Sequence, residues 1–193
     1  MKNKTVVLTA LMIALALPAF AGEEVKALRA AQKIERQAHS EQQKQENQTF
    51  RQRLKAVPKD QRVTSITEHR NQQFTENQAF RADQQQKRAD ALSRGLAANT
   101  RLTAEEKAKI IANRQTQTQE NQAFREQKHQ ENIAKFQQVA TDPNLTHGQK
   151  KDEMKVFRDA QKVVTQAHFE QQRTENKALH DGIKAAHPKT ATP

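Results

Sequence analysis

The stretch Glu-Asn-Gln-Thr-Phe-Arg at residues 46–51 decides the fold, because it recurs along the chain. It returns as Glu-Asn-Gln-Ala-Phe-Arg at residues 76–81 and 120–125, and in degenerate form as Glu-Asn-Lys-Ala-Leu-His at residues 175–180. Half of the positions in residues 31–56 also match residues 160–185, and both segments contain Ala-His-x-Glu-Gln-Gln. These matches indicate an internal duplication, which is typical of folds built from similar helical units.

Helix-breaking residues divide the chain into four segments, each with one copy of the motif. The breaks lie near Pro58, at residues 95–103 and at residues 142–148, and the segments between them are rich in Ala, Gln, Glu, Lys and Arg. Such residues favour helix over strand. The sequence therefore predicts an all-α fold of four long helices, arranged as elongated helical hairpins or as an open bundle.

The helix starts carry their own signals, because Ser or Thr followed three residues later by Glu or Gln can form a capping box. Three such pairs follow the breaks: Ser65 with Glu68, Thr103 with Glu106, and Thr146 with Gln149. We expect the second, third and fourth helices to begin at these pairs.

The apolar stripe of these helices is interrupted by polar waists. In the last helix, for example, no large apolar residue occurs between Phe169 and Leu179. One interpretation is that the helices pair through thin seams and leave their glutamine-rich faces in water. The other is that the polar waists and isolated Phe side chains form an adaptable contact surface. Because large apolar residues are scarce, we expect a coiled-coil-like homo-oligomer and not a thick single core.

The first residues have the pattern of a secretory signal peptide. Lys2 and Lys4 precede an apolar run at residues 6–17, and Ala-Phe-Ala at residues 19–21 supplies a cleavage site near Ala21. The run is too short to cross a bilayer, and no later segment is as apolar. We therefore expect a signal peptide at residues 1–21, one repeat-built domain at residues 22–187, a flexible tail at residues 188–193, and a periplasmic or secreted protein without a transmembrane segment.

The charge of the chain favours anionic partners. The formal net charge is +11, and the sequence contains no Trp, Tyr or Cys. Export, dispersed charge and the lack of Trp and Tyr stacking residues argue against nucleic acid. Anionic envelope polymers need only distributed Lys and Arg, so they fit better.

Nothing in the sequence indicates an enzyme or a bound cofactor. There is no phosphate-binding loop, no His-Glu-x-x-His and no nucleophile elbow. His39 and His168, at equivalent positions of the duplication, are the weak metal candidates. Each is followed two residues later by Glu, and residues i and i+2 do not share a helix face. A metal- or ligand-sensing adaptor remains the third functional class.

The Leu-Thr-His-Gly-Gln segment at residues 145–149 resembles the Leu-Thr-x-x-Gln motif of the Spy and CpxP family of periplasmic stress proteins. Residues 102–106 are similar, with Glu in place of the Gln. The residues that match the motif are Leu102, Thr103, Glu106, Leu145, Thr146 and Gln149. The resemblance implies a small all-α protein that dimerises into a curved, basic cradle and holds unfolding clients without ATP.

Taken with this resemblance, the repeats lead to a functional hypothesis. We expect an ATP-independent, chaperone-like stress-response protein that binds unfolded or partly folded clients through a basic helical surface. The candidate contact residues are those at the aromatic position of the repeated motif: Phe50, Phe80, Phe124 and Leu179. Alternatively, the Phe residues form the seams that pair the helices. The runner-up function is a structural or scaffolding protein of the cell envelope.

Overall fold

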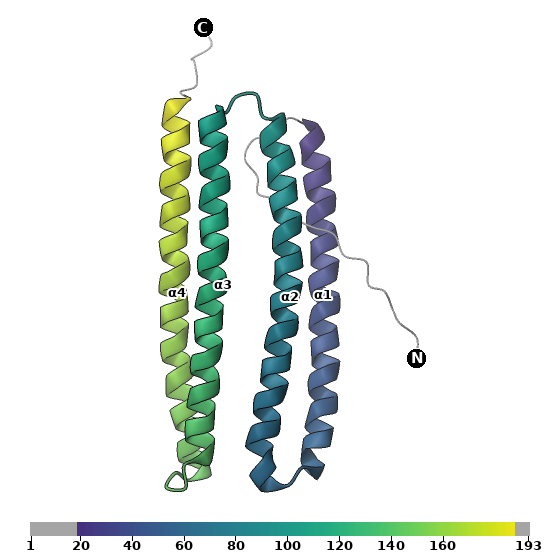
Figure 1. Cartoon of the computed structure of the whole chain (residues 1–193), viewed down its shortest axis with the longest axis vertical. Helices are drawn as coiled ribbons and strands as arrows, with labels where there is room; N and C mark the ends of the chain where they lie inside the picture. Colours follow the sequence, from purple (N-terminus) through teal and green to yellow (C-terminus); the bar gives the residue numbers. More distant parts are fainter. Residues whose placement is uncertain (1–18, 188–193) are drawn as a thin grey trace, which may run out of the picture. The chain divides into compact units, whose positions relative to one another are not determined.

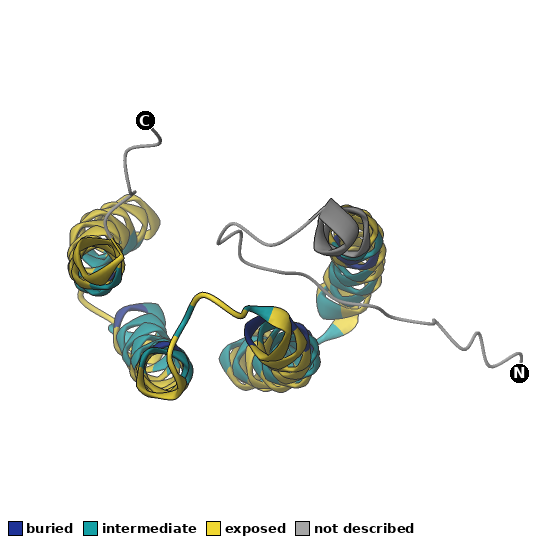
Figure 2. Ribbon diagram, turned by 90° about the horizontal axis from the view of Figure 1, so that it is seen from above, coloured by how far each residue is buried: buried dark blue, intermediate teal, exposed yellow. Residues whose placement is uncertain are grey.

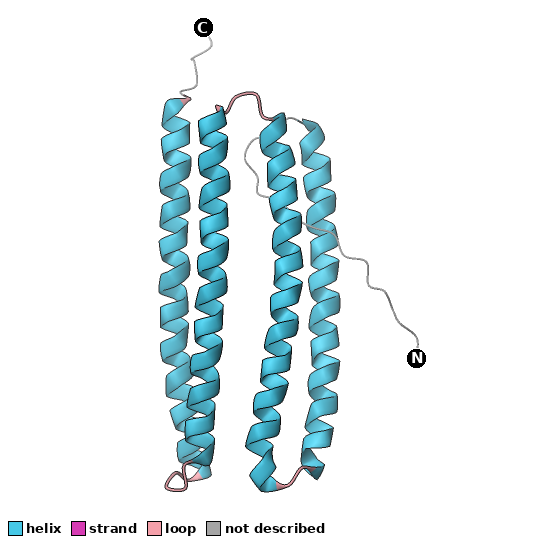
Figure 3. Ribbon diagram, in the orientation of Figure 1, coloured by secondary structure: helices cyan, strands magenta, loops and turns pink. Residues whose placement is uncertain are grey.

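The protein, described here by a computed structural model of residues 19–187, consists of long helices joined by short loops (Figures 1 and 3). These residues form α1 (Ala19–Ala56), η1, a 3₁₀ turn (Lys59–Gln61), α2 (Arg62–Ala98), α3 (Ala104–Thr141) and α4 (His147–Ala186), and no strand. The all-α prediction with four long helices is confirmed. Residues 1–18 of the expected signal peptide and the expected tail at residues 188–193 lie outside the described residues.

The helices pair into two compact units, and along the chain the first unit ends at Leu102 and the second begins at Thr103. Hairpin 1 consists of α1, η1 and α2, and hairpin 2 consists of α3 and α4; in each, the two long helices contact one another. A single domain was expected over residues 22–187, and the described part of that range is divided into these two hairpins. None of the described helices is long and apolar enough to cross a membrane.

Two of the three expected capping boxes are confirmed, and both lie in hairpin 2. The Thr103 hydroxyl accepts from the amide of Glu106, whose carboxylate accepts from the Thr103 amide at 2.8 Å. Thr146 and Gln149 form the same reciprocal pair at the start of α4. Each box satisfies amide groups that have no partner within the helix.

The capping box expected at Ser65 was wrong, because α2 already begins at Arg62. Pro58 starts the 3₁₀ turn, which leads directly into the helix. The Arg62 side chain then donates to the carbonyl oxygens of Val57 at 2.9 Å and Lys55 at 3.3 Å. These bonds satisfy carbonyl groups at the end of α1 and place the start of α2 ahead of Ser65.

The break expected from residue 95 begins later than predicted. Gly95 and Leu96 are buried inside α2, and the helix continues to Ala98. Glycine in a helix costs only about 1 kcal/mol relative to alanine, which burial can offset. The chain turns at Asn99, whose side-chain oxygen accepts from the amides of Arg101 and Leu102 at 2.9 and 3.2 Å.

The buried interior of the described residues is small (Figure 2), and it includes both apolar and polar side chains. The buried apolar residues are Ala91, Leu96, Ile110 and Val139, and the buried polar or charged residues are Gln32, Glu35, Gln84, Gln117 and Gln172. Buried polar groups require hydrogen-bond partners. The pairing of the helices therefore depends on how the polar waists are satisfied.

Candidate functional site

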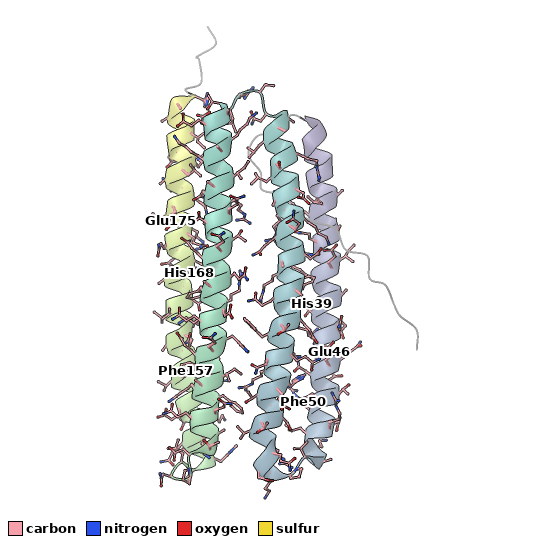
Figure 4. The ribbon with its side chains drawn as sticks, in the orientation of Figure 1. His39, Glu46, Phe50, Phe157, His168 and Glu175 are labelled. Carbon is pink, nitrogen blue, oxygen red and sulfur yellow. The ribbon has the colours of Figure 1, made fainter. Side chains whose placement is uncertain are left out.

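The polar waists lie in the seams between paired helices, where they form a repeated contact that we name the His–Asn–Phe bracket. In hairpin 1, the ring of His39 on α1 stacks on Phe80 of α2, with ring centroids 4.1 Å apart and planes 6° from parallel. His39 Nε2 lies 3.1 Å from the side-chain oxygen of Asn77. His39, which is labelled in Figure 4, is therefore held by a hydrogen bond at its edge and an aromatic ring on its face.

The bracket occurs three times in the described residues. His69 on α2 stacks on Phe50 of α1 at 3.9 Å and lies 3.1 Å from the oxygen of Asn47. In hairpin 2, His168 on α4 stacks on Phe124 of α3 at 4.1 Å and lies 3.2 Å from the oxygen of Asn121. Hairpin 1 thus has two reciprocal brackets, and each helix supplies the histidine of one of them.

The bracket fixes which histidine nitrogen carries the proton. In each bracket the asparagine Nδ2 donates to a backbone carbonyl four residues earlier, that of Gln43, Gln73 or Gln117, at 2.7–2.8 Å. The asparagine oxygen therefore faces the histidine and can only accept, so Nε2 donates.

A fourth bracket position exists in hairpin 2, but its residues differ. Asn113 of α3 stands where the other helices have His, and Leu179 of α4 stands where they have Phe. Asn113 Nδ2 donates to the side-chain oxygen of Asn176 at 3.0 Å. The hydrogen bond of the bracket is kept, but Asn113 and Leu179 have no aromatic rings and cannot form the stack.

These contacts define a longer repeat than the motif at residues 46–51. Three helices contain His-x-x-Gln-Gln-x-x-Glu-Asn-x-x-Phe or its Leu variant, starting at His39, His69 and His168. Because His and Asn have the same spacing on both helices, an antiparallel pair that brings His39 to Asn77 also brings His69 to Asn47. The equal spacing in the sequence was the signal for this pairing, and sequence reasoning missed it by starting the repeat at Glu46.

In hairpin 2, the glutamines at the centre of the repeat form a connected network. Gln117 Nε2 donates to the backbone oxygen of Gln172 at 3.3 Å, and Asn121 donates to the Gln172 side chain at 2.7 Å. Asn176 Nδ2 donates to Gln117 Oε1 at 2.9 Å. Gln117 and Gln172 are 2% and 7% exposed, so this network satisfies amides that have little access to solvent.

The corresponding glutamines of hairpin 1 are less well paired. The Nε2 atoms of Gln43 and Gln73 are buried and have no hydrogen-bond partner among residues 19–187. Gln32, eleven residues before Gln43, is fully buried, and neither of its amide atoms has a hydrogen-bond partner in the described part of the chain. Nearby, the buried Glu35 accepts from Gln84 and lies 3.7 Å from Lys87 Nζ.

A shallow polar groove of about 330 Å³ opens beside one bracket of hairpin 1. It is lined by Gln42, Gln45, Glu46, Thr49, Arg53, His69, Gln72 and Gln73. Burial lowers the pKa of His69 and the nearby positive charge of Arg53 lowers it further, against the opposing effect of Glu46 and Glu76. Both effects favour the neutral imidazole.

The structure places the predicted contact residues within the repeat. Phe50, Phe80 and Phe124 are half-buried and stack on histidines of the facing helix, which is the seam position considered as the alternative. Leu179 is half-buried at the corresponding position of α4. Client contact by these residues stays a prediction.

The two histidines considered as metal candidates are engaged in brackets. His39 and His168 each lie with Nε2 toward an asparagine and with one face on a phenylalanine. Within the described part of the chain, no group of three or more His, Cys, Asp or Glu side chains could hold a metal ion.

The motif that resembles the stress-protein family lies at the starts of α3 and α4. Its Thr and Glu or Gln residues are the capping boxes described above, and Leu102 and Leu145 are half-buried directly before them. Glu106 also contacts His187 at 2.9 Å, joining the start of α3 to the end of α4. No family model, curated protein or solved structure matches this chain. Membership of that family stays a prediction.

Proposed function

We propose that the protein is an ATP-independent, chaperone-like protein that binds unfolding polypeptides, and that hairpin 1 is its client-binding element. One observation carries the proposal: among the described residues, the seam of hairpin 1 holds buried amides without hydrogen-bond partners in the same repeats as two phenylalanine rings. Gln43 Nε2 and Gln73 Nε2 are buried without hydrogen-bond partners among residues 19–187, and Phe50 and Phe80 lie seven residues, about two turns, further along the same helices.

The unpaired amides weaken the closed state of this seam. A buried polar group without a partner costs about 1–3 kcal/mol, so opening hairpin 1 regains part of that free energy. Opening also exposes Phe50 and Phe80, which supply non-directional apolar contact. The released Gln and Asn amides can hydrogen-bond the backbone of an extended client, whatever its sequence.

The charge of the chain supports the same role. The net charge of +11, or +9 once Lys2 and Lys4 are removed with the signal peptide, attracts acidic, partly unfolded polypeptides over a range set by the ionic strength. We expect capture to weaken as salt is raised, because the first encounter is electrostatic. We further propose that the protein acts in the periplasm after cleavage near Ala21. The mass of the chain recovered from the periplasmic fraction tests that cleavage.

Light scattering of a chemically unfolded model protein, diluted with and without the chain, tests the client-binding proposal. The decisive variant is Phe50→Ala with Phe80→Ala, which removes both aromatic rings from the brackets of hairpin 1. The matched control is Phe124→Ala with Leu179→Ala, which alters the equivalent positions of hairpin 2. We expect suppression of aggregation by the native chain and the control, and a loss of at least half in the first variant.

Circular dichroism must show that both variants keep their helicity. If the two variants lost the same amount of aggregation suppression, the assignment of client binding to hairpin 1 alone would be contradicted. That result would indicate that both hairpins bind clients. Absence of suppression by the native chain at every ratio would contradict the chaperone proposal and favour the scaffolding alternative.

A further inference from the structure

The helix α4 carries an exposed apolar stripe that no described residue covers. Val156 and Val163 are 70% and 65% exposed, and the exposed Ala160 and Ala167 complete the spacing of four, three and four residues. This spacing places the four side chains on one face of the helix. The seam to α3 uses a different face, which includes Gln161, His168 and Gln172 (Figure 4).

We propose that this stripe is a homodimer interface in which α4 of two copies packs antiparallel. The two-fold axis passes between Gln161 and Lys162, the midpoint of the stripe. Ala160 then faces the partner's Val163, and Val156 faces the partner's Ala167. Each large side chain meets a small one, which allows close packing, and every contact occurs twice, as an isologous interface requires.

The charges along one flank of the stripe select this orientation. Asp152, Lys155, Asp159, Lys162, Glu170 and Arg173 are exposed. The antiparallel pairing brings Asp152 to the partner's Arg173, Lys155 to the partner's Glu170, and Asp159 to the partner's Lys162. A parallel pair would instead set each charge beside its own copy. Flanking charges of this kind determine helix orientation in coiled coils.

The duplicated helix α1 provides a natural comparison. The equivalent positions on α1 are Ala27, Ala31, Ile34 and Ala38, so a single large side chain replaces two. Ala30 also replaces the charge of Asp159 on the flank. Ile34 is 66% exposed, almost the same as the 65% of its equivalent, Val163. The stripe of α1 therefore has less apolar area and weaker charge pairing, which makes it the matched control.

Sedimentation of the purified chain, with Val163→Glu and Ile34→Glu as variants, tests the interface. We expect a concentration-dependent dimer for the native chain and for Ile34→Glu, and at least a tenfold weaker dimer for Val163→Glu. Circular dichroism checks that helicity is unchanged. A native chain that is monomeric at about 100 µM, or equal behaviour of the two variants, overturns the proposal.

The orientation has a separate test, because the chain contains no native cysteine. The variant Val156→Cys with Ala167→Cys cannot close a disulfide within one helix, since eleven residues rise by roughly 16 Å. In the antiparallel dimer, the cysteine at position 156 of each copy lies beside the cysteine at position 167 of the other copy. Oxidation should therefore give a covalent dimer. Val156→Cys alone should not cross-link. Efficient cross-linking of the single variant would indicate a parallel pair and overturn the antiparallel arrangement.

The flank charges add a third, smaller test. Asp152→Arg should weaken the dimer a few-fold at low salt, because it faces the partner's Arg173. Adding Arg173→Asp in the same chain restores opposite charges and should restore the affinity. Failure of the double variant to recover would contradict the charge register.

Discussion

Hairpin 1 and hairpin 2 are built from the same repeat but satisfy it differently. Hairpin 1 has two complete His–Asn–Phe brackets, yet it buries the Gln32 amide and the Nε2 atoms of Gln43 and Gln73 without hydrogen-bond partners among the residues that the structure describes. Hairpin 2 has one complete bracket, and its central amides of Gln117 and Gln172 are joined in a network. One hairpin is richer in aromatic stacks, and the other is richer in satisfied amides.

The difference separates two contributions to a polar helix seam. A stacked pair adds about 0.5–1.5 kcal/mol, whereas a buried amide without a partner costs about 1–3 kcal/mol. The unpaired amides can therefore outweigh the additional stack. We expect hairpin 2 to be the more stable unit, although it has fewer complete brackets.

The largest expected effect comes from breaking the network of hairpin 2. Gln117→Leu removes the donor to Gln172 and the acceptor for Asn176, and should lower the free energy of unfolding by about 2 kcal/mol. Native-state hydrogen exchange of α3 and α4 measures the loss. The matched variant Gln73→Leu in hairpin 1 removes an Nε2 that has no partner in the described chain, so it should be neutral or stabilising. Equal destabilisation by both variants would refute the comparison.

Removing the unpaired amide of hairpin 1 should have the opposite sign. Gln32 is fully buried with both amide atoms unpaired among the described residues, so Gln32→Leu should raise the free energy of unfolding by about 1.5 kcal/mol. Slower hydrogen exchange in α1 and α2 would report the gain. Gln48→Leu, at an exposed position of α1, is the control and should change little.

Completing the fourth bracket should strengthen hairpin 2 further. Asn113→His with Leu179→Phe recreates the residues of the other brackets, and we expect a gain of about 1 kcal/mol from the added stack. The single variants should give less than half of that gain, because each lacks its ring partner. A double variant no more stable than the sum of the singles would show that the fourth position cannot form the bracket.

The smallest expected effect is a difference in acid sensitivity. The folded pKa of His69 lies below its ordinary value of 6.5, so the unfolded chain binds this proton more readily. The contribution of His69 to the stability of hairpin 1 is complete above about pH 6.5, and it is lost as the pH falls below that value. In hairpin 2, hydrogen bonds from Lys128 and Gln161 lower the pKa of Glu131 from 4.5 to about 2. The contribution of Glu131 to the stability of hairpin 2 is therefore lost only as the pH falls from about 4.5 toward 2.

Urea unfolding followed by amide resonances of each hairpin, at about pH 7 and about pH 5.5, checks this order. We expect the midpoint of hairpin 1 to fall more than that of hairpin 2. His69→Asn, the residue that α3 carries at this position, removes the titrating ring and should reduce the difference. An unchanged difference would assign the pH dependence to other groups.

The sequence was sufficient to predict the four helices and the positions at which two of them begin. Thr103 and Thr146 begin helices as expected because a capping box is a local device that depends on four consecutive residues. The prediction at Ser65 was wrong because a local pattern does not include contacts with the preceding helix. Arg62 donates to a carbonyl group at the end of α1, and α2 begins at Arg62, upstream of Ser65. A contact between two helices outweighed a local signal.

The brackets could not be predicted from helical periodicity alone. His39 was considered only as a weak metal candidate beside its equivalent His168, and His69 was not singled out, because single-helix patterns do not show which face meets a partner. The equal spacing of His and Asn on paired helices contains that information only when two segments are compared in antiparallel order. The unpaired state of Gln32 depends on its surroundings in the folded hairpin, which no spacing rule supplies.

The short connections within each hairpin have a consequence for the order of folding. α1 and α2 are joined through residues 57–61, and α3 and α4 through residues 142–146. Chains dominated by contacts close in sequence fold rapidly, and each hairpin can zip from its turn toward its open end. During synthesis, hairpin 1 is complete before α4 exists, so it can close without waiting for the second half of the chain.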